Sequence, residues 1–346
     1  MPLVHVKIKK KRRSKRPSLK RKPWAWLKWR LRRISGLQWG LAIAMGALPI
    51  WPFVLSGLYV SSLVSLFYGW YALFLLLACC SLLFWRSLRV PALIGLASVF
   101  LNYTPPFFQD LVLNRLPAGV TSQGHLTVVT RNWLESNKTY DGFLTWLRAQ
   151  SPDVLAIQEI PPAFEDYYPE IKSAYPYSTE AGSARDLIIL SRFPIQKTLA
   201  VPVGDHFALG VEVQTPSGPV RIYDLHPDTL IDAGRWANRN DYLEHVESAI
   251  DTGQIPTIVV GDLNATAWEP RLQRLKVELG LHEEPRLKPP TTRVLGRLGP
   301  LFYGAPIDHV YGNDLVKLSE CRPIAQFGSD HRPLMCTANF GRKSSQ

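Results

Sequence analysis

Residues 257–264 read Thr-Ile-Val-Val-Gly-Asp-Leu-Asn, an apolar run that ends in a carboxylate and an amide. The apolar run predicts a buried strand, and side chains two residues apart on an extended chain point to the same side. We therefore expect Asp262 and Asn264 to face one pocket. A carboxylate beside an amide suits a site that orients water and binds a phosphate oxygen. The alternative is a simple turn at a strand end, and the pattern alone favours neither.

Similar short strands recur along the C-terminal two-thirds of the chain. They alternate with polar stretches typical of helices, which we expect around 140–150 and over 232–252. This mixture of hairpins and crossover helices predicts an α/β fold with mixed sheets, and about 220 residues can bury a sizeable core. The other expected strands are HLTVVTRNW (125–133), DVLAIQE (153–159), DLIILS (186–191), ALGVEVQ (208–214), VRIYDLH (220–226), IDHVYG (307–312) and PLMCTANF (333–340).

Polar side chains stand at the ends of three of these strands, where a buried strand would not normally hold them. Glu159 is a natural ligand for a hard cation such as Mg²⁺ or Mn²⁺, or else a solvated glutamate at a strand end. Asn132 has the same ambiguity. For His226 three interpretations stay open: a general acid, a donor to phosphate, or a histidine whose hydrogen bonds are satisfied near the core.

Two Asp-His pairs lie near the C-terminus, Asp308 with His309 and Asp330 with His331. An aspartate that accepts a hydrogen bond from a histidine favours the imidazolium, which can then donate to a phosphate. His309 follows Asp308 within an expected strand and should point to the opposite face, so we interpret it as structural. His331 is the better candidate for catalysis.

The cysteines show no metal-ligand spacing such as CxxC. Cys79 and Cys80 lie inside an apolar run. Cys321 and Cys336 lie on either side of an expected turn near Gly328, so a hairpin there would bring them together. A disulfide and a pair of buried free thiols both stay open.

The N-terminal third of the chain has a different composition. No Asp or Glu precedes Asp110, and residues 1–109 carry 17 Lys and Arg, of which 15 lie in residues 1–33. Residues 110–346 carry the other 23 Lys and Arg and all 28 acidic residues. The net charge of +12 is therefore the sum of +17 in residues 1–109 and −5 in residues 110–346. The basic overall charge therefore does not indicate a nucleic-acid-binding protein.

An uncharged stretch of more than 50 residues follows the basic segment and ends at Trp85. Because a membrane-spanning helix needs about 20 apolar residues, this stretch is long enough for two spans. We expect them near 37–55 and 63–85, joined by a turn over 56–62. A third candidate, 90–108, is bounded by prolines and is the least regular.

Charge also indicates an orientation for these spans. A basic segment beside apolar residues is typical of a cytoplasmic N-terminus, and Arg86 and Arg89 then lie on the cytoplasmic side too. Three spans through an inner or plasma membrane would place the C-terminal domain outside the cytoplasm, as we expect, whereas two would leave it inside. We divide the chain into a basic segment (1–33), a membrane anchor (34–109), a linker (110–124), a globular domain (125–341) and a tail (342–346).

The ordered set of motifs TRNW, DVLAIQE, ILSRFPI, LHP, GDLNATAW, IDHVYG and GSDHRPL resembles the endonuclease/exonuclease/phosphatase superfamily. The resemblance runs from about 125 to 340, and the NATAW variant after apolar N-terminal segments is most similar to a bacterial, membrane-associated branch. It implies a two-sheet sandwich flanked by helices. It also implies hydrolysis of phosphodiester or phosphomonoester bonds by in-line attack of water, with Mg²⁺ or Mn²⁺ as cofactor.

The resemblance further implies a role for each matched residue. Glu159 would bind the metal with Asn132 and Asp330 nearby, and Asp262 would orient or deprotonate the attacking water. His226 would lie near the leaving group or the phosphate, and Asp308 would support His331. The residues implied to contact the substrate phosphate are Asn132, Asn264 and His331.

The substrate stays open at this stage. Nucleic acid is our first expectation, and a phospholipid headgroup is the alternative. An anchor in the bilayer would hold the enzyme near a phospholipid substrate. The net acidic domain argues against a strong grip on a duplex unless a local patch supplies the charge. Arg185, Arg235, Arg239 and Arg293 are candidates for such a patch, or else ordinary surface charges. A third hypothesis is a catalytically degenerate binding module tethered to the membrane. No protein partner can be inferred.

Overall fold

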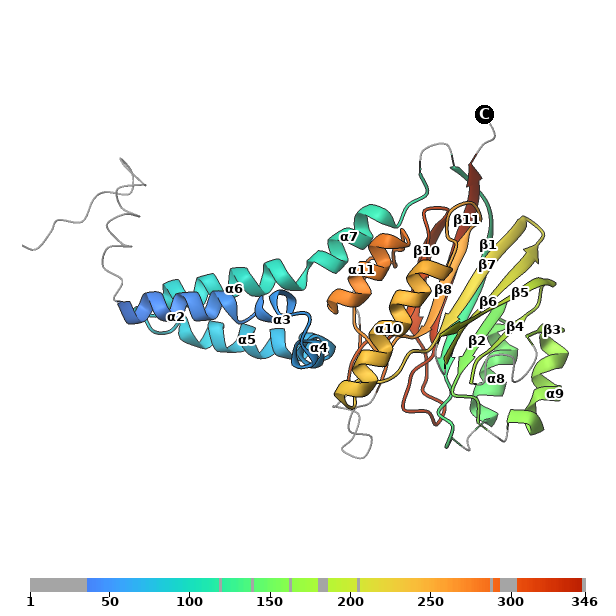
Figure 1. Cartoon of the computed structure of the whole chain (residues 1–346), viewed down its shortest axis with the longest axis horizontal. Helices are drawn as coiled ribbons and strands as arrows, with labels where there is room; N and C mark the ends of the chain where they lie inside the picture. Colours follow the sequence, from blue (N-terminus) through green and yellow to red (C-terminus); the bar gives the residue numbers. More distant parts are fainter. Residues whose placement is uncertain are drawn as a thin grey trace, which may run out of the picture.

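The computed structural model describes residues 36–117, 120–137, 140–161, 164–179, 186–203, 206–286, 289–292 and 304–343. A slender bundle of helices projects from one side of a larger α/β body (Figure 1). The expected basic segment 1–33 and most of the expected tail lie outside the described residues.

The N-terminal part is helical. Three helices, α2 (Gly36–Ala47), α5 (Tyr68–Leu82) and α6 (Arg89–Tyr103), run side by side (Figure 1). The chain therefore passes along the bundle three times before it enters the body. The turn expected over 56–62 is wrong in its second half, because a helix begins at Tyr59. The helices are α2 (Gly36–Ala47), α3 (Trp51–Val54), α4 (Tyr59–Leu66), α5 (Tyr68–Leu82), α6 (Arg89–Tyr103) and α7 (Pro105–Leu113).

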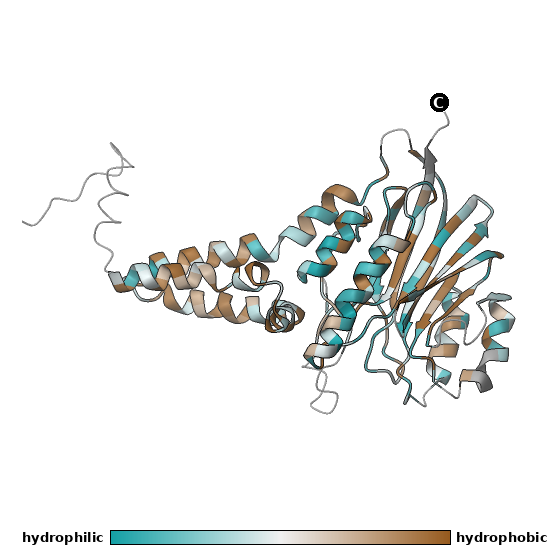
Figure 2. Ribbon diagram, viewed as in Figure 1, coloured by the Kyte–Doolittle hydropathy of each residue, from teal (hydrophilic) through white to brown (hydrophobic). Residues whose placement is uncertain are grey.

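The bundle is apolar on its outside as well as its inside (Figure 2). Large side chains such as Leu37, Phe74 and Phe84 are exposed. Among the described residues, the helix from Arg89 to Leu113 is long and apolar enough to cross a membrane, and α4 with α5 would form a second span if this pair, bent by 76°, counts as one. The span expected near 37–55 is interrupted between α2 and α3.

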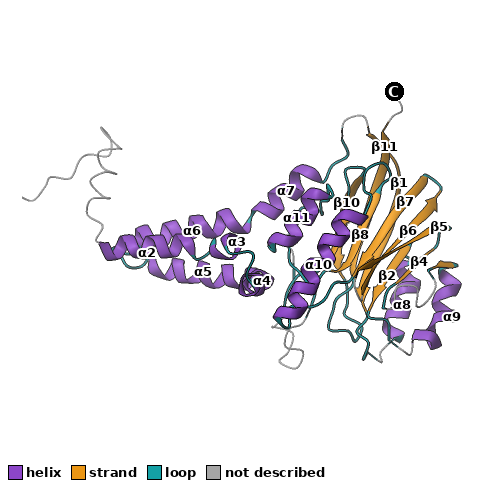
Figure 3. Cartoon of the chain, in the orientation of Figure 1, coloured by secondary structure: helices purple, strands orange, loops and turns teal. Residues whose placement is uncertain are grey.

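The body contains two sheets that pack face to face, with helices on both outer faces (Figure 3). The expected two-sheet α/β sandwich is therefore confirmed. The first sheet has the order β10-β11-β1-β2-β4-β3 and the second β5-β6-β7-β8-β9. The first comprises β1 (Val120–Asn132), β2 (Val154–Gln158), β3 (Tyr177–Ser178), β4 (Ile188–Ser191), β10 (Val316–Pro323) and β11 (Leu334–Lys343); the second comprises β5 (Ile195–Val203), β6 (His206–Thr215), β7 (Gly218–Leu225), β8 (Thr257–Asp262) and β9 (Asp308–Gly312).

Apolar side chains fill the space between the sheets. Leu126 and Val128 of β1 meet Ile258 and Val260 of β8 in one fully buried cluster, because alternate residues of a strand point to the same face. The outer face of the first sheet is covered by α8 (Asp141–Gln150) and α9 (Phe164–Ala174), and that of the second by α10 (Ala233–Ala249) and α11 (Pro270–Glu278). Burial on both faces explains why the central strands read as continuous apolar runs.

Several strands differ from the sequence-based expectations in extent. β1 begins at Val120, five residues earlier than expected, and pairs with β11 up to the end of that strand. Cys321 and Cys336, for which the sequence allowed either a disulfide or free thiols, form a disulfide that joins β10 to β11. β5 and β10 were not expected, because neither carries a continuous apolar run.

A buried ion pair joins the bundle to the body. Asp110 lies in α7, within the segment expected to begin a linker, and its carboxylate accepts a hydrogen bond from Lys276 of α11 at 2.9 Å. Both side chains are fully buried. Asp110 also accepts the backbone N–H of Glu283. A buried charge is tolerated only when it is paired, so the body depends on α7 for its own stability.

We predict that Asp110→Ala lowers the free energy of unfolding by about 3–5 kcal/mol, because it leaves the Lys276 ammonium buried without its counter-ion. The matched control is Asp251→Ala, which removes the exposed one of the two carboxylates that pair with Arg221 and should cost no more than about 1 kcal/mol. Denaturant unfolding of the full chain measures both. Equal losses in the two variants would show that the buried pair does not hold the bundle to the body.

Candidate active site and metal centre

The sequence-predicted site residues gather at one end of the sandwich. Asn132 ends β1, Glu159 directly follows β2, and His226 directly follows β7. Asp262 ends β8 and pairs in register with Asp308 at the start of the antiparallel strand β9. Both sheets therefore contribute polar side chains to the same edge.

The two sheets are linked by a single amide at this edge. Nδ2 of Asn132 donates to Glu159 Oε1 at 2.8 Å and to Asp262 Oδ2 at 3.0 Å. Its Oδ1 accepts the backbone N–H of Leu134, so the amide orientation is fixed. In this arrangement Asn132 holds the two carboxylates together rather than offering its own oxygen to a cation.

A glycine allows this close approach. Gly261 has φ +137°, and a Cβ there would lie 2.0 Å from the carbonyl oxygen of Leu225. Only glycine can adopt this backbone without strain. The end of β8 is thereby brought against the end of β7, which places Asp262 beside His226.

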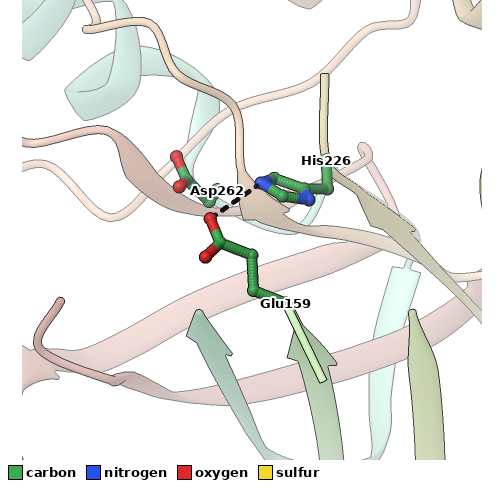
Figure 4. A group of neighbouring side chains, drawn as sticks. All are labelled: Glu159, His226 and Asp262. Atoms are coloured by element: carbon green, nitrogen blue, oxygen red, sulfur yellow. Dashed lines mark ion pairs between the residues drawn. The ribbon is translucent and has the colours of Figure 1, made fainter. Parts of the chain in front are cut away.

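His226 is oriented by an aspartate that the sequence reasoning did not single out. Its Nδ1 lies 2.6 Å from Asp186 Oδ2, and its Nε2 lies 3.7 Å from Glu159 Oε1. Figure 4 shows His226, Glu159 and Asp262 directed toward one point. Burial alone would lower the pKa of His226, but the hydrogen bond with Asp186 and the charge of Asp262 raise it to about 9.

His331 is held by Asp308, as the resemblance implied. Its Nδ1 lies 3.0 Å from Asp308 Oδ2, and its Nε2 lies 3.5 Å from Asp262 Oδ2. Burial opposes the charged ring, but Asp308 and Asp262 outweigh it and raise the pKa of His331 to about 10. At neutral pH His331 is therefore an imidazolium that can donate a hydrogen bond.

Two further buried polar residues, Asp224 and Gln158, lie two residues before His226 and one residue before Glu159, respectively. Asp224 was not predicted as a site residue. Asp224 is fully buried, and its Oδ1 accepts a hydrogen bond from Nε2 of Gln158 at 2.5 Å. Burial raises the pKa of Asp224 to about 8. Asp224 lies in the expected strand VRIYDLH, two residues before His226. Because alternate residues of a strand point to the same side, this spacing could have identified Asp224 as a neighbour of the site.

The chemistry of these groups fits a hard divalent cation. Two sets of ligand atoms come together in the described residues, Glu159 with His226 and Asp262, and Asp262 with Asp308 and His331. Burial, with the charge of Asp308, raises the pKa of Asp262, and a cation would offset that cost. Mg²⁺ and Mn²⁺ prefer carboxylate oxygen, which Glu159 and Asp262 supply.

Asp330, expected beside Glu159, does not join either set. Its Oδ1 is buried and has no hydrogen-bond partner among the described residues. Its charge contributes to the raised pKa of His331. Asp330 is thus placed on the His331 side of the site, with one oxygen free for a further ligand.

A pocket of about 420 Å³ opens over Glu159 and His226. Its walls carry the carboxylates of Glu135, Asp186 and Asp228, besides Glu159 itself, and one guanidinium, that of Arg235. Of the four arginines considered as an anion-binding patch, Arg239 is fully buried and paired with Glu269, which overturns that interpretation for this residue. Arg185 and Arg293 lie outside the described residues.

Sequence comparison identifies the family. Residues 131–331, more than half of the chain, match the model of the Endonuclease/Exonuclease/phosphatase family. The chain belongs to this family. The match begins beside Asn132 and ends at His331, so it spans every residue of the candidate site. The resemblance inferred from the motifs is confirmed at this level. No curated protein matches the chain in sequence.

Solved structures support the fold of the endonuclease/exonuclease/phosphatase family. An endonuclease/exonuclease/phosphatase from Beutenbergia cavernae is 18% identical, with a TM-score of 0.52 and coverage of 63% of this chain and 72% of that one. A family protein from Bacteroides thetaiotaomicron is 14% identical (TM-score 0.50, 63% and 98%). A humanized D. rerio TDP2 is 15% identical (TM-score 0.50, 62% and 99%). Members of this family are generally metal-dependent phosphoesterases.

We predict that Asp186→Asn lowers the pKa of His226 toward its ordinary value of about 6.5, because the substitution removes the charge that faces Nδ1. A pKa raised in the folded state stabilises the fold below about pH 6.5, and this contribution is lost as pH rises through about 9. The wild-type melting temperature should therefore fall more steeply between pH 7 and 9 than that of the variant.

Histidine NMR titration of the metal-free full chain measures the pKa directly. Asp241→Asn, at an exposed position of α10, is the control and should leave the titration unchanged. If His226 titrates at the same pH in wild type and Asp186→Asn, Asp186 does not set its charge.

Proposed function

We propose that this protein hydrolyses phosphoester bonds with the help of Mg²⁺ or Mn²⁺. The observation that carries the proposal is the single amide of Asn132, which holds Glu159 of one sheet and Asp262 of the other within reach of two imidazoliums. Negative groups that could hold a cation thus face positive donors that could hold a phosphate. A merely structural cluster has no need of both.

Each residue contributes a separate function in this mechanism. Asp262 orients the attacking water and accepts its proton. His331, kept protonated by Asp308, donates to a phosphate oxygen. Asn264 uses one amide hydrogen to hold the carbonyl of Pro227, and its second amide hydrogen can donate to the phosphate. When bound, a cation held by Glu159 and Asp262 would supply electrostatic stabilisation of the charge that develops on the phosphate.

His226 serves the leaving-group side in this proposal. It groups with Glu159 and Asp262, whereas His331 groups with Asp262 and Asp308, and Asp186 keeps His226 protonated at neutral pH. A protonated imidazole can donate to the oxygen that departs, as a general acid. In-line displacement would need the phosphate to lie between Asp262, which assists the attacking water, and His226, which assists the leaving oxygen.

The charges around the pocket bear on the substrate. Nucleic acid, our first expectation, is normally gripped by several Lys and Arg along its backbone, whereas the described pocket walls offer four carboxylates and the single guanidinium of Arg235. If the substrate is a nucleic acid, we propose that it is a short strand or a single-stranded end rather than a duplex.

A phospholipid is the second candidate, and a specific observation favours it. An apolar groove of about 290 Å³ between α5 and α6 shares Gly69, Leu73 and Tyr103 with a neighbouring pocket of about 210 Å³ at the junction with the body. That second pocket reaches Trp268 and Pro306, near Asp308. An acyl chain in this groove would bring its headgroup to the body.

We also propose that the bundle anchors the protein in an inner or plasma membrane, with the body outside the cytoplasm. The connection between α5 and α6, which carries Arg86 and leads into Arg89, lies beside the start of α2, because Nε2 of Gln38 donates to the carbonyl oxygen of Ser87 at 2.6 Å. The start of α2 is at the end of the bundle far from the body (Figure 1). The Cys321–Cys336 disulfide is of the kind found in oxidising compartments.

We predict metal-dependent hydrolysis by the purified full chain. With Mg²⁺ or Mn²⁺ it should cleave at least one member of a panel containing bis(p-nitrophenyl) phosphate, single-stranded DNA, duplex DNA and phospholipid vesicles, and EDTA should abolish the activity. Asp262→Ala should reduce kcat by about 10³-fold. Asp314→Ala, at an exposed position, is the control and should keep full activity. Absence of any metal-dependent cleavage that Asp262→Ala removes would contradict the proposal and revive the degenerate binding module.

The topology has its own test. In spheroplasts of a bacterial host, externally added protease should digest a C-terminal epitope on the body, because the body lies outside the cytoplasmic membrane. A cytoplasmic marker protein must stay intact in the same sample. Protection of the epitope until detergent is added would place the body inside the cell and contradict the proposed orientation.

A further inference from the structure

The loop that follows Asp262, residues 264–269, is fixed from the body side at two successive carbonyls. Arg239 Nη1 donates to the carbonyl oxygen of Asn264 at 3.1 Å, and His309 Nε2 lies 2.8 Å from that of Ala265. His309 is in turn bound through Nδ1 to Glu283 at 2.7 Å. All these side chains are buried, so the backbone beside Asn264 cannot relax into solvent.

The helical bundle fixes the same loop at the residues that come next. Thr266 Oγ1 donates to the carbonyl oxygen of Ser65 in α4 at 2.7 Å. Trp268 Nε1 donates to the carbonyl oxygen of Tyr103 in α6 at 3.0 Å, and the two rings stack at 4.9 Å. Two hydrogen bonds from the bundle therefore end on the loop that carries Asn264.

A chain of hydrogen bonds connects α4 to Asn264 itself. Ser62 Oγ donates to Glu269 Oε1 at 2.8 Å, and the same oxygen accepts from Arg239 Nη2 at 3.1 Å. Arg239 then reaches the Asn264 carbonyl through its other terminal nitrogen. Ser62 also accepts from Trp236 Nε1 at 3.0 Å, which fixes the direction of its hydroxyl.

The position of Arg239 depends on this chain. Its guanidinium is fully buried, and its Nε has no hydrogen-bond partner among the described residues. Glu269 is its counter-ion, and the orientation of the Glu269 carboxylate is set by Ser62 on one oxygen and by the N–H groups of Arg271 and Leu272 on the other. Loss of the Ser62 hydroxyl removes one of the donors that fix Glu269 against Arg239.

We propose that α4 is a positioning element of the catalytic centre, in which Ser62 acts through Glu269 and Arg239 to fix Asn264. The inference rests on the proposed function, in which Asn264 donates to the substrate phosphate. Asn264 has φ +48°, a left-handed conformation that its surroundings must hold in place. The helical bundle is thus a structural part of the active site as well as an anchor.

The experiment compares two serine-to-alanine variants of the full chain. Ser62→Ala removes the link to Glu269, whereas Ser98→Ala removes a hydrogen bond from Ser98 Oγ to the Gly46 carbonyl (2.7 Å), which lies within the bundle and has no contact with the loop. We expect Ser62→Ala to lower kcat for bis(p-nitrophenyl) phosphate about tenfold with KM little changed, because small displacements of a positioning group cost rate rather than binding. Ser98→Ala should keep the wild-type kcat.

Two further measurements separate positioning from general loss of structure. Amide hydrogen exchange of residues 264–266 should be faster in Ser62→Ala and unchanged in Ser98→Ala, when both are assayed well below their melting temperatures. Ser62→Thr, which retains a hydroxyl, should recover most of the lost kcat. Equal kcat and equal exchange in the two alanine variants would overturn the proposal. Exchange can be measured even if the wild-type chain hydrolyses nothing, so failure of the proposed function is distinguishable from failure of this inference.

Discussion

The structure depends on bringing two carboxylates from different sheets to one amide nitrogen, Nδ2 of Asn132. Glu159 and Asp262 would repel each other if they were merely close, and burial raises the cost of their charge. Asn132 compensates both with its two amide hydrogens, and the rings of His226 and His331 add positive charge nearby. The backbone allows this only because Gly261 lets β8 lie against the end of β7. The ends of β1, β2 and β8 are therefore held together by the hydrogen bonds of Asn132 with Glu159 and Asp262.

The same constraint extends into the helical bundle. A buried arginine, Arg239, fixes the loop after Asp262, and it needs the buried Glu269 as its counter-ion. A second buried pair, Lys276 with Asp110, ties α11 to α7. Because the buried Lys276 ammonium is stable only when Asp110 of α7 is in place, we expect the bundle and the body to unfold as one unit.

Most of the sandwich and many of its site residues could be predicted from the sequence, for identifiable physical reasons. β2 and β8 are buried on both faces and read as apolar runs, and polar residues at their ends stand out against that background. β5 was missed because its exposed positions include Gln196 and Lys197, so that it does not read as a continuous apolar run. Asp186 and Asp224 were missed because their role arises from contacts with His226 and Gln158, which lie about 40 and 66 residues away. The extent of α4 and the burial of Arg239 likewise depend on packing between distant segments.

The central claim is that the junction of the two sheets is a divalent-cation site for phosphoester hydrolysis. Its most direct test is the binding of Mn²⁺ to the purified full chain, followed by electron paramagnetic resonance, in wild type, Glu159→Gln, Asp262→Asn and the exposed control Asp314→Asn. The account predicts that wild type and Asp314→Asn bind Mn²⁺ with equal affinity, and that each of the other two binds it at least about tenfold more weakly. Equal Mn²⁺ affinity in all four proteins would contradict it.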